Sequence, residues 1–275
     1  GKRDINLPVI SAEAFPETLR VEPTLFLRTS GGLLADTIKS VAFAMSQDEA
    51  HFAYNGTHVH SGNLDGTDDG GATFVASDGL RFACKHLDSV QTDGSWPEQP
   101  IIIHRKTIAE LIRICAKTEK EVTVGVSDRG LVLDFPGGKL ASKLVDGKFP
   151  PYQKLLSIEY DKHVLAKASA FCSTLDYLTP LTEKKSNAVK LVFGGNLLEL
   201  STVADGATAE DELAIDYSGD EFTVGANGPY LNEAASHLNC ESVAVSLLDD
   251  STGIKLTAPD DDSAAHVVQP MKIFF

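Results

Sequence analysis

Two pairs of segments in this chain resemble each other. The first pair is I-A-E-L at residues 108–111 followed by E-V-T-V at 121–124, and the second is L-N-E-A at 231–234 followed by S-V-A-V at 242–245. In each pair, a segment with helical spacing precedes an alternating strand. A deletion between helix and strand aligns the pairs. An internal repeat of roughly 120 residues is far too long for a solenoid and predicts two copies of one α+β domain.

Each of the two repeated halves of the chain is expected to contain two helices and several antiparallel strands. In the first half, Leu34, Ile38 and Val41 have the spacing of an amphipathic helix. The expected helices cover residues 31–45, 105–117, 163–175 and 230–238. The expected strands cover residues 52–61, 73–84 (a pair), 122–126, 131–135, 189–193, 197–203, 243–247 and 253–257.

A proline pair marks the boundary between the halves. The segment at residues 147–152 suits neither a regular helix nor a central strand, because Pro150 and Pro151 lack backbone donors and restrict their neighbours. We therefore expect one domain over residues 20–157 and another over 158–275. Ahead of them, residues 4–7 predict a strand that runs into a proline-punctuated linker, so that residues 1–19 form a separate segment.

The composition is that of an ordinary folded protein with an acidic balance. Hydrophobic residues make up 43%, and the formal net charge is −15. Such acidity argues against a surface coated with nucleic acid, but it leaves room for a confined basic surface. No apolar run reaches the ~20 residues that span a bilayer, and we expect a cytoplasmic protein that does not bind membranes. The scattered cysteines are expected to be reduced; they are Cys84, Cys115, Cys172 and Cys240.

One expected helix has two contrasting faces. At about 100° per residue, residues 105–120 place a basic stripe opposite an apolar one. The basic stripe consists of Lys106, Arg113, Lys117 and Lys120, and the apolar stripe of Ile108, Leu111, Ile112 and Cys115. The basic stripe fits a polyanion such as double-stranded DNA. A solvated face without a ligand is the alternative, and Glu110 within the stripe favours it.

Three further segments resemble those of one family. They are S-D-G-L-R-F-A at residues 77–83, S-K-L-V-D-G-K-F-P-P-Y at 142–152 and A-A-H-V-V-Q-P-M-K at 264–272. In this order and spacing they resemble bacterial sliding clamps, the beta subunits of DNA polymerase III, and the resemblance runs from Lys2 to Ile273. It implies repeated DNA-clamp domains, each with two helices packed on antiparallel sheets. In the full-length family, a head-to-tail homodimer with three domains per subunit closes a ring of six.

The resemblance also implies a function without catalysis. A sliding clamp encircles double-stranded DNA and serves as the processivity factor of the replicative DNA polymerase. Loose contacts to phosphates permit sliding, whereas base readout would stop it, and no base-reading or catalytic motif is evident here. The resemblance implies no cofactor and no metal. Its protein partners would be the replicative polymerase, the clamp loader and repair proteins, each docking a short peptide.

In the family, these peptides bind between the middle and last domains. The corresponding positions here are Tyr54, Ser77, Gly79, Leu80, Phe82, Pro150, Lys154, Leu155, Val267, Gln269, Met271 and Lys272, with Asn227 and Tyr230 at the rim. Apolar walls suit leucine and aromatic anchors, and methionine adapts to varied ligands. The alternative is that these residues simply seal the seam between two domains.

Three positions depart from the family pattern. Leu80 stands where a histidine is common, which removes a polar contact. Lys154 stands where an arginine is common, which removes a forked donor. Phe274 and Phe275 extend the chain beyond Ile273, and they are expected to fold back onto the peptide site or to pack against a neighbour.

The front of the chain resembles the end of the family's first domain. Residues 2–16 match its final strand and linker, so we expect a chain shortened by the rest of that domain; a natural two-domain trimer is the alternative. The positions expected at the subunit interface are Ile5, Leu7, Leu181, Glu210 and Glu212.

Two patterns leave room for metal chemistry. Residues 65–70 resemble a calcium loop but lack its distal glutamate, which favours the tip of a long hairpin. His58 and His60 alternate on a strand without an evident third ligand, which favours exposed strand histidines. Two hypotheses therefore compete with a clamp. One is a metal-dependent hydrolase that uses the two histidines and the acidic loops, and the other is a stand-alone clamp-like module that binds peptides but does not close a ring on DNA.

Overall fold

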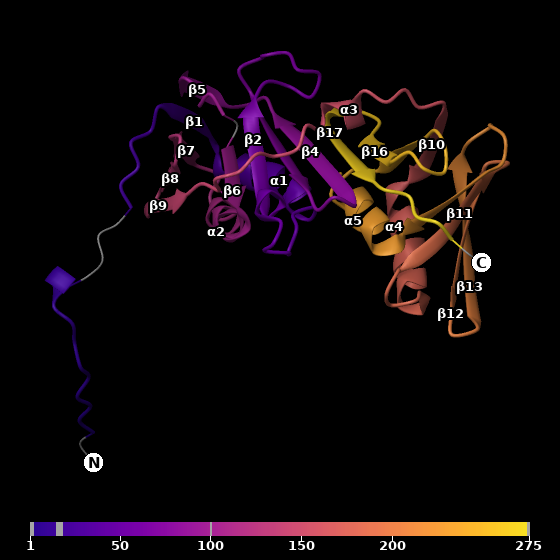
Figure 1. Ribbon diagram of the computed structural model, residues 1–275, viewed down its shortest axis with the longest axis horizontal. Helices are drawn as coiled ribbons and strands as arrows, with labels where there is room; N and C mark the ends of the chain where they lie inside the picture. Colours follow the sequence, from indigo (N-terminus) through magenta and orange to yellow (C-terminus); the bar gives the residue numbers. More distant parts are fainter. Residues whose placement is uncertain (1–2, 15–18, 100, 274–275) are drawn as a thin grey trace.

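The protein contains two large hydrophobic cores, one in each half of the chain. The structure is a computed structural model that describes residues 3–14, 19–99 and 101–273 (Figure 1). The first core lies within residues 25–133 and the second within residues 164–268. The two halves carry the same order of elements, apart from one extra strand in the first, β5.

The first half follows a short 3-10 turn, Ala12–Ala14, and a second such turn, Phe52–Tyr54, lies inside it. Its elements are β1 (Leu25–Ser30), α1 (Gly31–Ala42), β2 (Gly56–Ser61), β3 (Ala72–Ser77), β4 (Arg81–Leu87), β5 (Gln91–Gly94), β6 (Ile101–His104), α2 (Arg105–Cys115), β7 (Glu121–Val126), β8 (Gly130–Phe135) and β9 (Gly138–Lys143).

The second half follows a one-turn helix, α3 (Gln153–Leu156). Its elements are β10 (Lys162–Lys167), α4 (Ala168–Leu178), a 3-10 turn (Thr179–Leu181), β11 (Ala188–Gly194), β12 (Leu197–Ala204), β13 (Ala207–Asp216), β14 (Phe222–Asn227), α5 (Gly228–Ser236), β15 (Ser242–Leu247), β16 (Ile254–Ala258) and β17 (Asp261–Val268).

Strand β17 joins the two halves. The first half contains a five-stranded sheet in the order β5-β1-β7-β8-β9, and a twelve-stranded sheet, β14-β11-β12-β13-β10-β15-β16-β17-β4-β3-β2-β6, crosses from one half to the other. At the junction β17 pairs antiparallel with β4, and Val267 lies opposite Phe82. Because successive side chains in a strand point to opposite faces, β17 presents different residues to the two faces of this junction.

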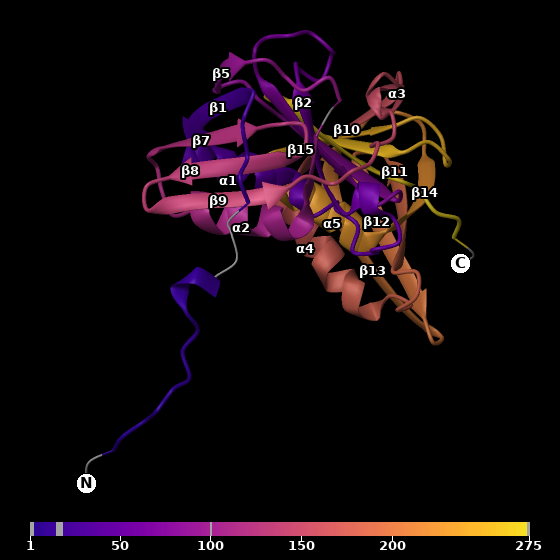
Figure 2. The same ribbon diagram turned by 60° about the vertical axis from the view of Figure 1, so that its left-hand side comes forward.

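The four long helices lie on one face of the junction. Helices α1 and α2 pack together in the first half, as do α4 and α5 in the second (Figures 1 and 2). His266 of β17 lies between the pairs: its Nδ1 is 2.7 Å from the Ala234 carbonyl oxygen of α5, and its ring meets that of Phe43 just after α1. The face opposite the helices is therefore the one to which Ala265 and Val267 point.

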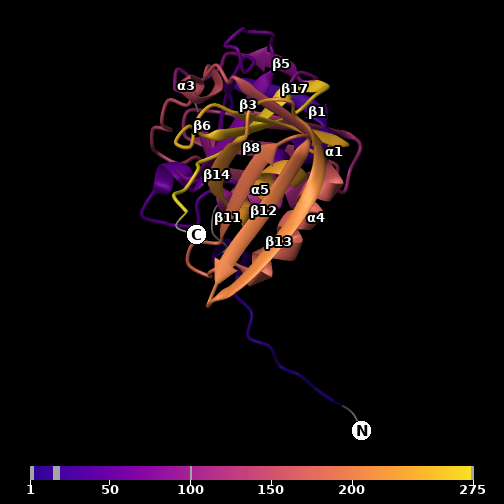
Figure 3. The same cartoon turned by 90° about the vertical axis from the view of Figure 1, so that its right-hand side faces the viewer.

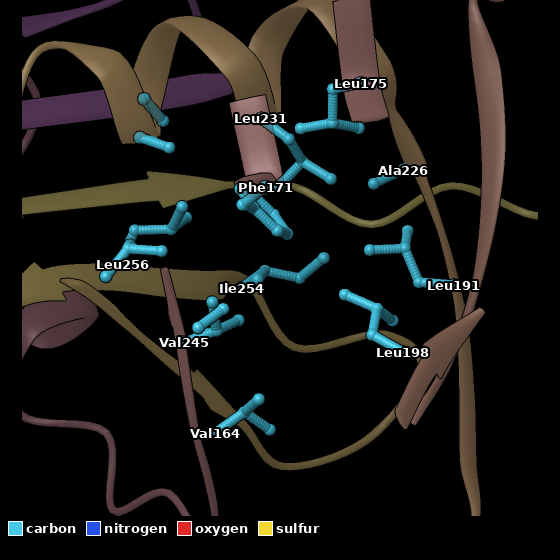
Figure 4. Close-up of a cluster of buried hydrophobic side chains, with 14 of the residues drawn as sticks. Val164, Phe171, Leu175, Leu191, Leu198, Ala226, Leu231, Val245, Ile254 and Leu256 are labelled. Carbon is cyan, nitrogen blue, oxygen red and sulfur yellow. The ribbon is translucent and has the colours of Figure 1, made fainter. Parts of the chain in front are cut away.

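The second core illustrates how the helices are fastened to the sheet. Phe171 and Leu175 of α4 and Leu231 of α5 are fully buried against Leu198 and Ile254 of the strands (Figure 4). Each such side chain contributes about 1.5–3 kcal/mol when it leaves water. The prediction of an α+β fold with two helices on antiparallel sheets in each half is confirmed. None of the described helices is long and apolar enough to cross a membrane.

The predicted strand at residues 4–7 is wrong. This segment extends away from the rest of the molecule without strand pairing (Figures 1 to 3), and Ile5 and Leu7 are 81% and 77% exposed. A strand needs a neighbour for its backbone donors and acceptors, and none of the described strands lies beside these residues.

The predicted helix start near residue 163 is also wrong. Residues 162–167 form β10, which pairs with β13 and β15, and α4 begins at Ala168. Val164 and Ala166 point into the core while their neighbours are exposed, which is the period of a strand. The pairing partners come from far along the chain, so the local pattern did not identify them.

Several other elements have limits that differ from those predicted, and two of these differences have a clear physical reason. Strand β2 begins at Gly56, not at residue 52, and a Cβ at Gly56 would lie only 2.3 Å from the Ile103 carbonyl oxygen of β6. Helix α2 ends at Cys115, where the amides of Lys117 and Thr118 bond to carbonyls three residues back. Such bonds tighten and close the last turn of a helix.

Candidate functional site

A small third core seals the junction on the face opposite the helices. Its buried residues come from β3, β4 and β17 and from the segment that links the halves; they are Val75, Phe82, Cys84, Tyr152, Ala265 and Val267. Leu155 of α3 packs against this core and is partly buried. Cys84 donates from its Sγ to the Ala265 carbonyl oxygen at 3.3 Å, and burial raises the pKa of its thiol to about 12.

The turn between β3 and β4 is built by polar side chains. Ser77 Oγ accepts from the Gly79 amide at 3.1 Å, and Asp78 Oδ1 accepts from the amides of Leu80 and Arg81 at 2.9 and 3.0 Å. Gly79 has a φ of +90°, which an L side chain rarely adopts. The result is that Leu80 is held at the tip of the turn, 57% exposed.

Arg81 connects this turn to the second half. Its Nε lies 3.1 Å from Asp78 Oδ2, and its Nη1 pairs with the carboxylate of Glu233 on α5. The guanidinium also lies over the ring of Tyr230 and near that of Phe43. Arg81 is absent from the predicted set of site residues, although it lies inside the quoted 77–83 segment.

The C-terminal segment crosses the same junction. The Gln269 amide donates to the Leu80 carbonyl oxygen at 2.9 Å, and the Met271 amide donates to the Gly225 carbonyl oxygen of β14 at 2.8 Å. Lys272 is exposed, while Gln269 and Met271 are partly buried. Phe274 and Phe275 lie outside the described residues.

Aromatic rings line the segment that links the two halves. The Tyr54 ring lies 5.8 Å from that of Phe149, which stacks on His58 at 4.9 Å, and the Tyr152 ring lies 5.2 Å from that of Phe82. These contacts hold the segment against β2 and β4. Pro150 and Lys154 are consequently displayed on its surface, where both are exposed.

The predicted peptide-binding residues therefore occupy three kinds of position. Phe82 and Val267 are buried and support the junction from within. Asn227 caps α5 by accepting from the Tyr230 amide at 3.0 Å. Ser77 is buried like Phe82 and Val267, and its hydroxyl builds the turn before Leu80. The remaining predicted residues are exposed or partly exposed at the junction; they are Tyr54, Gly79, Leu80, Pro150, Lys154, Leu155, Tyr230, Gln269, Met271 and Lys272.

The two strand histidines are used structurally, and the prediction that both are exposed is wrong, because they pack under the aromatic rings of the linking segment. His60 Nε2 lies 2.5 Å from the Tyr152 hydroxyl and its Nδ1 2.6 Å from the Ser61 carbonyl oxygen. His58 is buried, and burial lowers its pKa to about 3, with a further contribution from His60. In the described part of the chain, no group of three or more His, Cys, Asp or Glu side chains could hold a metal ion.

The predicted basic stripe is split in the structure. Lys106 and Arg113 are exposed on α2, whereas Lys117 and Lys120 lie in the turn after it and are also exposed. Arg113 pairs with Glu110 at 2.5 Å, an interaction that lowers the pKa of the Glu110 carboxyl. The prediction of one continuous helix carrying all four cations is wrong, because the helix closes at Cys115.

The residues predicted at a subunit interface lie far apart. Ile5 and Leu7 lie in the extended N-terminal segment, while Leu181, 46% exposed, follows α4. Glu210 and Glu212 are exposed on β13, in the long hairpin of β12 and β13 (Figure 3). The N-terminal segment and this hairpin lie at opposite ends of the molecule in Figure 1.

Family comparison accounts for both halves. The sequence model of the DNA polymerase III beta subunit, central domain, matches residues 29–151, and that of its C-terminal domain matches residues 153–272. The chain belongs to the DNA polymerase III beta-subunit family. The resemblance noted in the sequence is thereby confirmed, as is the expectation of a clamp subunit in place of an enzyme.

Individual relatives agree with this assignment. A beta sliding clamp of Caulobacter vibrioides is 26% identical over 99% of this chain and 73% of the relative. The crystal structure of the DNA polymerase III subunit beta from Pseudomonas aeruginosa superposes with a TM-score of 0.88 at 26% identity, covering 96% of this chain and 70% of that one. A beta sliding clamp from C. crescentus gives the same TM-score and identity over 99% and 72%.

Proposed function

We propose that this chain works as a sliding clamp, with double-stranded DNA on its helical face and docked peptides on the opposite face. The observation that carries the proposal is the alternation along β17. His266 points to the helices, while Val267 and Ala265 point to the small core beneath Leu155. One strand thus separates two surfaces that could be used at the same time.

On the helical face, the proposed DNA contacts come from the first half. Lys106, Lys117 and Lys120 are exposed cations, and cations of this kind bind phosphates without reading bases. Arg113 is engaged by Glu110 and is expected to contribute less. The net charge of the whole chain is −15, so these cations would form a local basic surface on an otherwise acidic protein.

On the opposite face, the proposed peptide site surrounds Leu80, Leu155 and Met271. Leu80 is exposed and Leu155 and Met271 are partly so, which offers apolar area to leucine and aromatic anchors. Lys154 and Lys272 are exposed beside them and suit an acidic residue of the peptide. The proposed ligands are the peptide motifs of the replicative polymerase, the clamp loader and repair proteins.

Ring closure requires further copies of the chain. We propose that Ile5 and Leu7 pack near Leu181 of a second copy, with Glu210 and Glu212 forming polar contacts around them. The high exposure of these apolar side chains supports a covered state in the assembly. The proposed role also predicts a cytoplasmic location, together with the DNA.

The test is to measure mass in solution and retention on DNA. Light scattering on the whole chain is expected to give a stable oligomer. After incubation with clamp loader and ATP, this oligomer should remain on circular DNA and leave linear DNA. A monomer that binds the peptide but is never retained on circular DNA would contradict the ring and favour the stand-alone module.

A further inference from the structure

Residues 269–273, the last that the structure describes, form a strap between the two halves. Gln269 donates its amide to Leu80 of the first half, and Met271 donates its amide to Gly225 of the second. Pro270 between them has no amide to donate. Every backbone donor from residue 269 to residue 271 is therefore either used or absent, and the strap is fixed at both ends.

Gly225 lies where the strap meets the sheet. It belongs to β14, the strand at one edge of the twelve-stranded sheet, and it pairs with Lys190 on its inner side. A Cβ at residue 225 would lie 2.5 Å from the Met271 carbonyl oxygen and 2.5 Å from Cγ2 of Ile273. Both distances are well below van der Waals contact, so the strap can lie in this position only over a glycine.

From these contacts we infer that Gly225 is a positioning residue for peptide docking: its missing side chain seats the strap and so sets where Met271 and Lys272 stand. The inference rests on the proposed function, because it assigns Gly225 an effect on the same peptide site. Gly225 is buried beneath the strap, so we expect it to act on the peptide through the strap and not by direct contact.

The effect of a side chain at residue 225 follows from what the clash involves. One of the atoms that would be displaced is the Met271 carbonyl oxygen, which belongs to the backbone and cannot move by a change of rotamer. The strap must lift from β14, which breaks the bond from the Met271 amide. The anchor at Leu80 is independent of Gly225, so Gln269 is expected to stay in place while the residues after Pro270 become mobile.

Gly194 provides a matched control. It ends β11, the strand next to β14, and a Cβ there would lie 3.6 Å from the nearest atom, in the side chain of Glu221. That is an ordinary contact. Gly194→Ala therefore adds the same methyl group to the same sheet without touching the strap.

The experiment compares Gly225→Ala with Gly194→Ala in the whole chain. Hydrogen exchange of the segment after Pro270 measures directly whether the strap stays on β14. Calorimetry with a synthetic polymerase-derived peptide measures the affinity of the docking site. Gly225→Ala is expected to speed exchange of the segment at least tenfold and to weaken peptide binding at least fivefold. Gly194→Ala is expected to change neither. Unchanged exchange in Gly225→Ala, or faster exchange with full affinity, would overturn the inference.

A second pair of variants separates positioning from general damage. In a chain that ends at Pro270, Gly225→Ala should cause no further loss of peptide affinity, because the two changes act on one contact. A further loss as large as in the full chain would overturn the inference. If Gly225→Ala fails to fold, Met271→Pro removes the same hydrogen bond from the other side and should raise exchange of the residues after it. Its loss of peptide affinity should exceed that of Met271→Ala, which keeps the hydrogen bond; unchanged exchange, or a loss of affinity equal to that of Met271→Ala, would overturn the inference.

Failure of the proposed function has a different signature. If the wild-type chain does not bind the peptide, the docking role falls, and the positioning role of Gly225 falls with it. Faster exchange in Gly225→Ala would then still support the contact between the strap and Gly225, because that measurement needs no peptide.

Discussion

The guanidinium carbon of Arg81 lies 4.2 Å from the centroid of the Tyr230 ring. Arg81 begins β4 in the first half and Tyr230 lies on α5 in the second, so one side chain fastens the two halves. The same guanidinium pairs with Asp78 and Glu233. Its side chain is only 11% exposed. Loss of one partner from a buried ion pair lowers protein stability far more than the same loss at the surface.

Replacement of Arg81 is expected to destabilise the protein. Arg81→Met keeps much of the apolar stem but leaves Asp78, whose side chain is 15% exposed, without its cation. We expect the free energy of unfolding to fall by about 2–3 kcal/mol, measured by urea denaturation. Lys39→Met is the control, because the pair of Lys39 with Asp36 is exposed and its loss should cost less than about 0.5 kcal/mol. Equal losses in the two variants would contradict the assignment.

His266 is expected to make the protein sensitive to mild acid. Burial lowers its pKa from 6.5 to about 4; His237 and Lys85 add to this, while a bond to the Ala234 carbonyl oxygen opposes it. Because the folded-state pKa lies below the unfolded one, the unfolded chain takes up the proton first as pH falls. The free energy of unfolding should therefore decrease below pH 6.5, by about 1.4 kcal/mol per pH unit, until about pH 4.

The matching variant is His266→Gln. Between pH 6.5 and pH 5 it should lose about 1.6 kcal/mol less than the wild type, measured by urea denaturation at both pH values. His163→Gln, at an exposed position of β10, controls for the removal of a histidine. An unaltered pH dependence in His266→Gln would contradict this account.

Met271 is expected to contribute side-chain contacts to the proposed peptide site. Its backbone is bonded to Gly225, so Met271→Ala should shorten the side chain without moving the strap. We expect affinity for a polymerase-derived peptide to fall about fivefold, or roughly 1 kcal/mol, by calorimetry. Thr223→Ala, at an exposed position of the same strand as Gly225, should have no effect. Full affinity in Met271→Ala would remove this residue from the site.

Lys117 is expected to act on DNA and not on peptides. Lys117→Glu should weaken binding to duplex DNA at low salt and reduce the slope of log K against log salt by about 1–2, because one cation is lost and one anion gained. Fluorescence anisotropy over a salt series measures both. Lys139→Glu on β9, where Lys139 already pairs with Asp134, is the control. A loss of peptide binding in Lys117→Glu would indicate misfolding instead.

The failures of the sequence-based prediction share a cause. The pattern at residues 162–167 has too few apolar positions to separate a helix from a strand, and its pairing with β13 and β15 decided the matter. Helix α2 ends at Cys115 because the amides of Lys117 and Thr118 form turn hydrogen bonds to carbonyls three residues back. The spacing of charged residues does not predict these bonds. Arg81 and Gly225 were missed because each acts through a residue distant in the sequence.

By itself, the sequence determined the fold class, the repeat of two halves, the family and the presence of the four long helices, but it missed the longest strand, β13, and the joining strand, β17. Periodicity, turn residues and short motifs are local properties, so they can be read along the chain. Only the tertiary structure decided which face each junction residue occupies, because that depends on the register of β4 with β17, which brings Cys84 and Ala265 together across 181 positions. That register separates the helical face from the proposed docking face, and a shift by one residue would exchange them.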